Sequence, residues 1–349
     1  MSARLGRRSF LFGSATALVH RLHAADRKEY AVEMKTLTYA RRGGSDLLLD
    51  LYLPQGTPGP VSTILFLHGG GWSGGTRTTG PDFKRFFAQD GFAMASIEYR
   101  LTPSIRFPSN AEDVKTAIRW LRANASAHGL NQRIGIWGTS AGGHLAAIAA
   151  LTPRGVFEGD GDPDQPSSVD CVLDAYGPSS LLLMDAQTDQ EKPTLQPIAP
   201  ALAAGGPAGP PAMPRHDAPA SAESKLIGAP IQTTPELSHA ASPLTYAHAG
   251  APPFLLMHGL ADNSVPHHQS VLMYEALAAA GNDVTLRLVD GLPHTFFNRT
   301  NLDEIAGPFR MDVYEHPKSG AESRGAESTR AERAGVFDVA RNFFTKHLS

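Results

Sequence analysis

Of the residues that could do chemistry in this sequence, Ser140 has the most informative neighbours. It lies in "RIGIWGTSAGGHLAAIAA", residues 133–150, directly after an apolar run and directly before a run rich in alanine. The pattern G-x-S-x-G is typical of a nucleophile on a sharp turn between a strand and a helix. Large side chains two positions away would collide on such a turn, and Gly138 and Gly142 occupy those positions. The alternative is a flexible crossover that happens to contain a serine.

A serine hydroxyl becomes a good nucleophile when a base takes its proton, and an imidazole base needs an acid to orient it. Asp262 in "LLMHGLADNSVP" and His294 in "LVDGLPHTFF" each follow an apolar run. Serine, acid, histidine is the order that this turn motif requires. We therefore expect Ser140, Asp262 and His294 to be nucleophile, acid and base. The alternative is that the aspartate is a turn residue and the histidine is structural.

Two other carboxylates lie close to the histidine in the sequence. Asp290 stands four residues before His294 on the strand side, so it is the second choice for the acid. Asp283 stands at the start of the apolar run that precedes His294, so it would lie at the opposite end of that strand from the histidine.

A glycine-rich segment could supply an electrophilic pocket. "HGGGW" follows an apolar run, and glycines let backbone N–H groups turn toward a ligand. We expect the N–H groups of Gly70, Gly71 and Ala141 to hold the anionic oxygen of a tetrahedral intermediate. The alternative is a simple glycine-rich turn. His68 is expected to support this loop rather than act as a second base. Trp72 is expected either to form a wall of the acyl pocket or only to pack against neighbouring side chains.

Strand-like and helix-like segments alternate along the chain and would position these residues. Strands are expected at 35–41, 47–54, 61–67, 92–100, 133–138, 169–178, 252–259 and 283–291. Helices are expected at 81–91, 110–125 with Asn110 as its cap, 143–151, 269–281 and 335–348. Such alternation predicts right-handed crossovers and a mostly parallel sheet covered on both faces. We expect one α/β catalytic domain over residues 30–349.

Composition excludes several classes of partner and site. A formal net charge of −3 gives no electrostatic footprint for nucleic acid or an anionic membrane. The single cysteine, Cys171, cannot form an intrachain disulfide or a zinc site built on several thiolates. We expect no metal and no cofactor, and the sequence leaves the oligomeric state open.

Three segments lie outside the regular alternation. Residues 1–25 carry Arg7 and Arg8 before a moderate apolar run, which resembles a twin-arginine export signal and predicts a periplasmic or secreted protein. The alternative is an ordinary basic leader, and the run is too short to span a bilayer. A Pro/Ala-rich insertion near 190–222 is expected to hold no regular element, and a charged insertion near 315–335 to be flexible or solvent-exposed.

Five motifs in order resemble a known group. "HGGGW", "EYRLTPSIRFPSNAEDVKTAIRWLR", "GTSAGGHLAA", "HGLADNSVP" and "GLPHTFF" are similar to those of the α/β-hydrolase esterases of the hormone-sensitive-lipase and bimodular feruloyl-esterase-like (BD-FAE-like) kind. The resemblance covers about residues 35 to 300 and the final helix. It implies an α/β-hydrolase fold and the same roles for Ser140, Asp262, His294, Gly70, Gly71 and Ala141.

The resemblance implies hydrolysis of carboxylic esters, with short-chain acyl, acetyl or feruloyl esters of carbohydrate as substrates. A second hypothesis keeps the triad and changes the bond, giving an aryl formamidase or a peptidase. A third is a non-catalytic binding module of the same fold, which predicts the loss of a triad member. The sequence departs from the group in its Pro/Ala-rich segment, in the length of residues 300–335, and in Leu292 and Pro293 before the histidine.

Overall fold

The computed structural model describes residues 28–203, 215–318 and 328–349. Within these ranges one sheet of ten strands runs in the order β1-β2-β4-β3-β5-β6-β7-β8-β9-β10. The strands are β1 (Val32–Arg42), β2 (Ser45–Pro54), β3 (Val61–Leu67), β4 (Ala93–Ile97), β5 (Leu130–Thr139), β6 (Cys171–Ala175), β7 (Phe254–Gly259), β8 (Val284–Val289), β9 (Phe309–His316) and β10 (Ser328–Ala334). The six strands from β4 to β8 pair in parallel, and antiparallel pairs flank them on both sides. The predicted mostly parallel sheet is confirmed.

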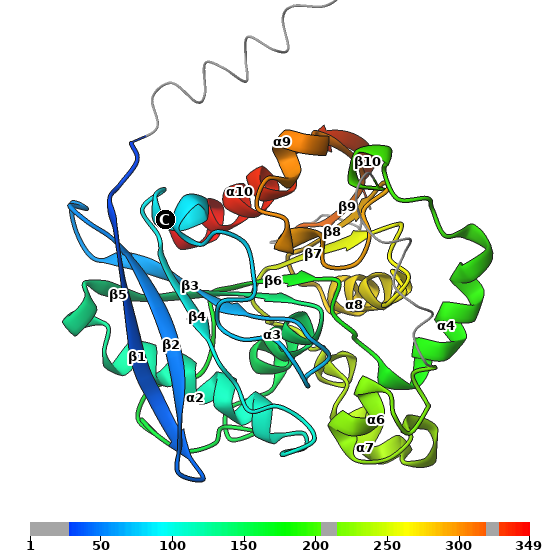
Figure 1. Ribbon diagram of the computed structural model, residues 1–349, viewed down its shortest axis with the longest axis horizontal. Helices are drawn as coiled ribbons and strands as arrows, with labels where there is room; N and C mark the ends of the chain where they lie inside the picture. Colours follow the sequence, from blue (N-terminus) through cyan, green and yellow to red (C-terminus); the bar gives the residue numbers. More distant parts are fainter. Residues whose placement is uncertain (1–27, 204–214, 319–327) are drawn as a thin grey trace, which may run out of the picture.

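Helices cover both faces of this sheet (Figure 1). One face carries α2 (Ser109–Ala123), α3 (Ala141–Leu151) and α8 (His268–Ala279), whose apolar side chains join one buried cluster. The other face carries the helical turn η1 (Lys84–Ala88), α9 (Leu302–Ala306) and α10 (Val336–Leu348), which join a second buried cluster. The central strands are therefore buried on both sides, which is why they read as continuous apolar runs.

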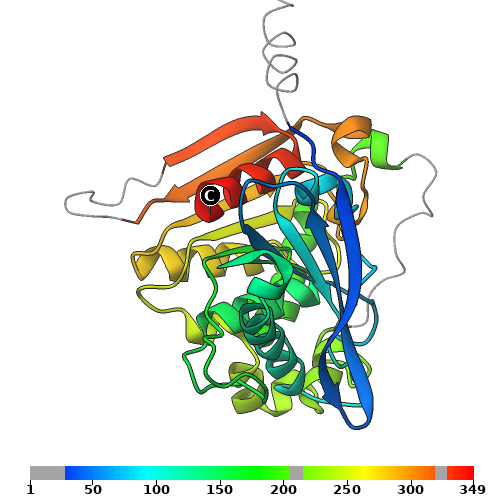
Figure 2. The ribbon, with the colours of Figure 1, turned by 90° about the vertical axis from the view of Figure 1, so that its left-hand side faces the viewer.

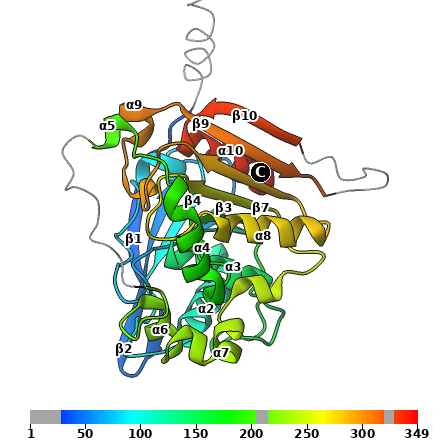
Figure 3. The same cartoon turned by 90° about the vertical axis from the view of Figure 1, so that its right-hand side faces the viewer.

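A group of short helices follows β6 and lies beyond the sheet. It comprises α4 (Met184–Glu191), α5 (Pro200–Ala203), α6 (Ala222–Ile227) and α7 (Pro235–Ala240). Figure 1 and Figure 3 show α4, α6 and α7 together on the side of the molecule away from β1. Single turns of 3-10 helix complete the described elements: η2 (Ser126–His128), η3 (Leu181–Leu183), η4 (Lys192–Thr194), η5 (Ile231–Thr233), η6 (Pro243–Tyr246) and η7 (Phe296–Asn298).

The Pro/Ala-rich insertion corrects one expectation, because it does contain regular elements. The turn η4 and the one-turn helix α5 both lie within residues 190–222. Pro200 begins α5, where its missing N–H costs no helical bond. Leu202 of this turn is buried in the second apolar cluster, so tertiary packing holds a segment whose composition suggested none.

The charged insertion near 315–335 forms a strand where the structure describes it, and Arg330, Ala331 and Arg333 of that strand are solvent-exposed, as expected. Its described part includes β10, which pairs antiparallel with β9 at the edge of the sheet (Figure 2). Cross-strand charge pairing explains the strand, since Arg330 contacts Glu315 and Glu332 contacts Arg287. Residues 319–327 of the insertion, and residues 1–25, where an export signal is expected, lie outside the described residues.

Two local expectations were also wrong. The helix expected over 81–91 is only the turn η1, because Phe86 and Phe87 have non-helical backbone angles and both rings are buried. Asn110 does not cap α2; Pro108 stands at the cap, and Asn110 is fully buried within the first turn. Among the described residues, no helix combines the length and the apolarity needed to cross a membrane.

Candidate active site

The parallel strands bring four loops to one edge of the sheet. Strands β3, β5, β7 and β8 all run in the same direction, so the segments that leave their carboxyl ends meet there. The glycine-rich loop follows β3, Ser140 follows β5, Asp262 follows β7 and His294 follows β8. Residues that lie far apart in the sequence thus become neighbours because of strand direction alone.

Ser140, His294 and Asp262 form a continuous chain of hydrogen-bond contacts. His294 Nε2 lies 2.9 Å from Ser140 Oγ, and His294 Nδ1 lies 2.6 Å from Asp262 Oδ2. Both distances are within hydrogen-bond range. A carboxylate only accepts, so Nδ1 carries the proton and Nε2 of the neutral ring is free to accept from the serine hydroxyl. This geometry is what activation of a hydroxyl requires.

The turn that carries Ser140 is sterically tight. Ser140 has φ of 56° and ψ of −121°, in a region that residues other than glycine rarely adopt. A Cβ on Gly138 would lie 2.0 Å from the carbonyl oxygen of Gly142, and one on Gly142 would lie 2.1 Å from that of Leu67. Neither approach is possible for a real side chain, so the two glycines are needed for the turn to form.

The Asp262 carboxylate is buried and held from both sides. Its Oδ1 accepts the backbone N–H groups of Ser264 at 2.8 Å and Val265 at 3.0 Å. Burial alone would raise its pKa, but hydrogen bonds from His294 and His258, and the attraction that the His294 ring exerts when it is protonated, lower the pKa below its usual range. Asp262 is therefore ionised at neutral pH and able to stabilise a charged imidazole.

Sequence reasoning missed His258, which is fully buried at the end of β7. Its Nε2 lies 3.2 Å from Asp262 Oδ2 and 3.0 Å from the Val265 carbonyl oxygen, while its Nδ1 lies 2.8 Å from Ser270 Oγ. It shares Asp262 Oδ2 with His294. No local pattern marks this residue, because it stands inside an apolar run that reads only as a buried strand.

Tyr176, which was also missed, packs against His294. It follows β6 at the same sheet edge, and its ring meets the His294 ring nearly edge-on at a centroid distance of 4.9 Å. The tyrosine is fully buried. The contact is an aromatic pair of the edge-to-face kind.

The glycine-rich loop runs beside the nucleophile. A Cβ on Gly69 would lie 3.2 Å from Ser140 Cβ, and Gly70 and Gly71 have φ of 118° and 57°. Ala141 is buried at the first position of α3, where its N–H has no partner within the helix. The loop and the helix start are thus adjacent, and donation of these N–H groups into the site stays a prediction.

His68 braces this loop, in agreement with the role expected of it. Its Nδ1 lies 2.8 Å from the Gly69 carbonyl oxygen, and its ring stacks on Tyr99 at 4.3 Å. The Tyr99 hydroxyl donates to the His68 carbonyl oxygen at 2.7 Å. Burial lowers the pKa of His68, so the ring stays neutral and structural.

The other two carboxylates that lie near His294 in the sequence contact basic residues. Asp290 accepts a hydrogen bond from Arg310 at 2.8 Å, and Asp283 forms an ion pair with Lys346 at 3.4 Å.

A cavity of about 250 Å³ opens beside the loop that carries Asp262. Most of the residues that line it are polar in type, but apolar atoms provide more of its exposed wall than polar atoms do. The polar residues include Asp185, Asp189, Arg215, His216, Asp262, Asn263 and Ser264. The cavity therefore combines apolar surface with hydrogen-bonding groups, which is typical of sites for small ligands, and Ser140 and His294 are not among the residues that line it.

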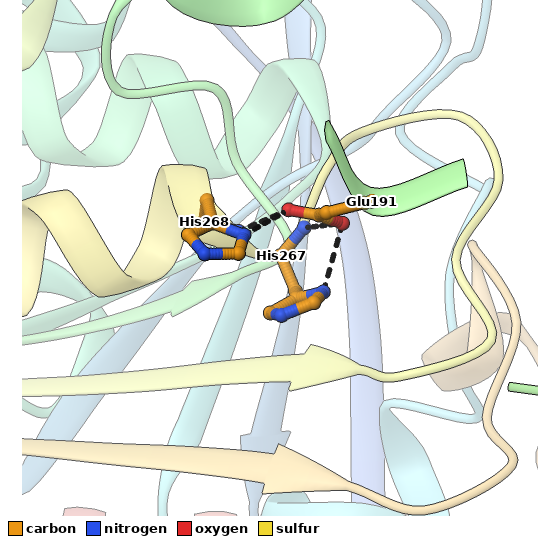
Figure 4. Close-up of side chains that lie close together, drawn as sticks. All are labelled: Glu191, His267 and His268. Carbon is orange, nitrogen blue, oxygen red and sulfur yellow. Dashed lines mark hydrogen bonds and ion pairs between the residues drawn. The ribbon is translucent and has the colours of Figure 1, made fainter. Parts of the chain in front are cut away.

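Within the described ranges, Glu191, His267 and His268 have the ligand types of a metal site, with atoms within 4.8 Å of one another. Figure 4 shows both rings turned toward the carboxylate. Each carboxylate oxygen also accepts a backbone N–H, from His267 at 3.0 Å and from His268 at 2.8 Å. The carboxylate thus caps the start of α8, where the helix dipole favours an anion and disfavours a cation. The arrangement fits a clamp between α4 and α8 better than a metal site.

Comparison with known proteins gives consistent relatives. A family model described as BD-FAE matches residues 49–277. Esterase LipC of Mycobacterium tuberculosis is 31% identical over 236 residues, which cover 66% of this chain and 52% of LipC. Esterase LipQ of the same organism is 30% identical over 258 residues, which cover 73% of this chain and 55% of LipQ. The chain therefore spans about half the length of these curated relatives.

Solved structures share the architecture. The esterase Est2 of the planctomycete Thermogutta terrifontis, in its propionate-bound form, is 26% identical with a TM-score of 0.58, and the match covers 81% of this chain and 91% of Est2. A truncated carbohydrate esterase from gut microbiota is 23% identical with a TM-score of 0.63, and the match covers 93% of this chain and 98% of that one. The second likeness bears on the fold alone.

Proposed function

The chain belongs to the BD-FAE family and has the α/β-hydrolase fold, and from this premise we propose that it hydrolyses carboxylic esters through a serine nucleophile. The observation that carries the proposal is the chain of contacts from Ser140 through His294 to Asp262. All three residues are present, and each is oriented toward the next, which a non-catalytic binding module would not need.

In the proposed reaction, Ser140 is the nucleophile and His294 is the base. Ser140 Oγ bonds to the ester carbonyl carbon while His294 Nε2 takes the hydroxyl proton, and the carbonyl oxygen becomes anionic. The N–H groups of Gly70, Gly71 and Ala141 hold that oxygen. The imidazolium then gives its proton to the leaving alkoxide as the carbon–oxygen bond breaks. Water repeats the sequence on the acyl-enzyme and releases the acid.

Two observations support short acyl esters of carbohydrate as the substrate class. The cavity beside Asp262 has charged and hydrogen-bonding side chains among its lining residues, including Asp185, Arg215 and Asn263, and these can contact the hydroxyl groups of a sugar alcohol. Est2, at 26% identity, was solved with propionate and, in a second structure at 25% identity, with butyrate. A short acyl group on a polar alcohol agrees with both.

The experiment that tests the proposal compares wild type and Ser140→Ala on p-nitrophenyl acetate, butyrate and octanoate, on methyl ferulate and on acetylated xylan. We expect Ser140→Ala to lower kcat by about 10⁴- to 10⁶-fold on every ester that the wild type cleaves. Acetate and butyrate should be preferred to octanoate.

A matched control and a matched amide sharpen this test. Ser126→Ala changes an exposed serine in η2, which precedes β5 and lies at the opposite edge of the sheet, and should leave kcat unchanged. Acetanilide has the acyl group of the acetate ester, and faster hydrolysis of this amide would favour the formamidase or peptidase alternative. Equal ester hydrolysis by wild type and Ser140→Ala would refute the proposal.

We also propose export of the protein through the basic leader at residues 1–25, on the basis of Arg7 and Arg8. Recovery of the chain outside the cytoplasm, abolished by Arg7→Lys with Arg8→Lys, would support this proposal; unchanged recovery would count against it.

A further inference from the structure

A buried chain of hydrogen bonds joins three parts of the molecule around the proposed site. The indole N–H of Trp72, in the glycine-rich loop, donates to Nδ1 of His144 in α3 at 3.2 Å. Nε2 of His144 lies 2.6 Å from the carbonyl oxygen of Ala241, the residue that directly follows α7. Trp72 and His144 are fully buried, so the chain is closed to solvent.

The chemistry of the two outer groups determines the state of the imidazole between them. An indole N–H can only donate and a carbonyl oxygen can only accept. His144 therefore accepts at Nδ1 and donates from Nε2, which makes it a neutral ring in one tautomer. Burial agrees with this assignment, since it lowers the pKa of His144 to about 4.

Trp72 needs such an anchor because its backbone is strained. It has φ of 54°, which is uncommon for a bulky residue, and it directly follows Gly71. Its carbonyl oxygen accepts the Thr102 N–H at 2.9 Å, and its ring meets the His144 ring edge-on at a centroid distance of 5.0 Å. The loop is thus held at the residue next to the expected oxyanion donors.

His144 is also tied to the nucleophile turn, because its backbone N–H donates to the Ser140 carbonyl oxygen at 3.0 Å. A Cβ on Gly71 would lie 3.1 Å from Ala222 Cβ, so α6 closes over the other side of the same loop. The relative position of the loop and the nucleophile therefore depends on a residue that contacts both.

We propose that His144 is a positioning residue that, through its buried hydrogen bond to Trp72, holds the Gly70 and Gly71 N–H groups in place for the oxyanion. This proposal rests on the proposed ester hydrolysis and adds a residue that does not touch the reacting atoms. Ala241 couples the loop to α7, so the short helices beyond the sheet help to set the geometry of the site.

The test uses variants that remove one hydrogen-bonding group at a time from the series Trp72, His144 and Ala241. Trp72→Phe keeps an aromatic ring and removes the N–H, His144→Leu removes both hydrogen bonds, and His144→Asn keeps an acceptor near the Nδ1 position. Loss of a whole oxyanion donor costs about 10²- to 10³-fold in rate, and a misplaced donor should cost less. We expect Trp72→Phe and His144→Leu to lower kcat by about 10- to 100-fold, with KM changed by less than about threefold. His144→Asn should recover part of the loss.

Two further readouts separate positioning from a general structural role. The affinity for an alkyl boronic acid, which mimics the tetrahedral intermediate on Ser140, should fall in parallel with kcat/KM across these variants. The double variant Trp72→Phe with His144→Leu should be no slower than His144→Leu alone, because both changes remove the same interaction.

The protein offers a matched control pair in Trp120 and His128, whose rings stack at 6.0 Å and lie beside η2, away from the site. Trp120→Phe and His128→Leu should leave kcat and boronate affinity unchanged. The positioning role is refuted if Trp72→Phe and His144→Leu stay within twofold of wild type, or if their losses multiply in the double variant. Failure of the proposed function is a different result, because wild type and Ser140→Ala would then hydrolyse esters equally.

Discussion

At the scale of single residues, the proposed acid is held by groups that the sequence motifs do not reveal. Asp262 Oδ2 is shared between His294 and the buried His258, while Oδ1 is occupied by two backbone N–H groups. All of its hydrogen-bonding capacity is therefore used. The acid can stay ionised in a buried position because each oxygen has donors to replace water.

His258→Leu should slow catalysis without removing a member of the triad. A hydrogen bond to a charged group contributes about 1.5–3 kcal/mol, so its loss in the transition state corresponds to about 10- to 100-fold in kcat. Steady-state kinetics on p-nitrophenyl acetate check this, with exposed His239→Leu as the control. A change in kcat of less than twofold in a folded His258→Leu protein would mean that Asp262 is oriented without it.

At the scale of elements, the nucleophile turn depends on close contact between β3 and α3. Gly142→Ala would place a Cβ 2.1 Å from the Leu67 carbonyl oxygen, which is backbone and cannot rotate away. We expect a loss of about 1–3 kcal/mol or more in the free energy of unfolding. Gly59→Ala is the control, because no atom lies within 4 Å of its Cβ position. Urea denaturation should separate the two variants clearly, and equal stability would contradict this account of the turn.

The clamp between α4 and α8 makes a second prediction at this scale. Glu191→Gln removes the charge that accepts from two backbone N–H groups and two imidazoles. The free energy of unfolding should fall by about 1–3 kcal/mol at pH 7. Exposed Glu275→Gln, on the same α8, should change it little.

The pH dependence of this effect has a definite sign. Burial would raise the pKa of Glu191, but hydrogen bonds from His267 and His268 lower it below its usual value. The stabilisation is therefore complete above the unfolded pKa of about 4.3 and is lost as the pH falls through the lower folded value. The gap between wild type and Glu191→Gln should narrow in denaturation curves below pH 4. If the difference in the free energy of unfolding between wild type and Glu191→Gln stayed constant down to pH 2, the negative charge of Glu191 would not be the source of the stabilisation.

At the scale of the whole molecule, one buried acid should set a pH trend in global stability. Burial raises the pKa of Asp174 to about 7, although its Oδ1 accepts the Gly177 N–H at 3.0 Å. Its unfolded pKa is about 3.9, so the folded protein loses stability as the pH rises from that value to about 7, and the loss is complete above it.

Asp174→Asn should therefore raise the melting temperature at pH 8, by an amount on the order of a few degrees, and have little effect at pH 4. Thermal melts of both proteins across this range check the prediction. Asp164→Asn, at an exposed site, should show no such trend. A destabilised Asp174→Asn at pH 8 would mean that the carboxylate is stabilised in the folded protein after all.

The sequence by itself was sufficient for the features that depend on neighbouring residues. The glycines around Ser140 reflect a steric clash within five residues, and the apolar runs before Ser140 and Asp262 reflect strands buried on both faces. Strand direction then follows from the alternation with helices, so one sheet edge could be predicted for the candidate triad. Its distances still had to come from the structure.

Only the tertiary structure decided the contacts that no local pattern encodes. The hydrogen bond from Trp72 to His144 spans 72 positions, and that from His268 to Glu191 spans 77. Composition also misjudged β10, which is a strand because β9 supplies its hydrogen bonds and opposite charges. Periodicity and turn chemistry act over a few residues, whereas these contacts depend on which surfaces the finished fold packs together.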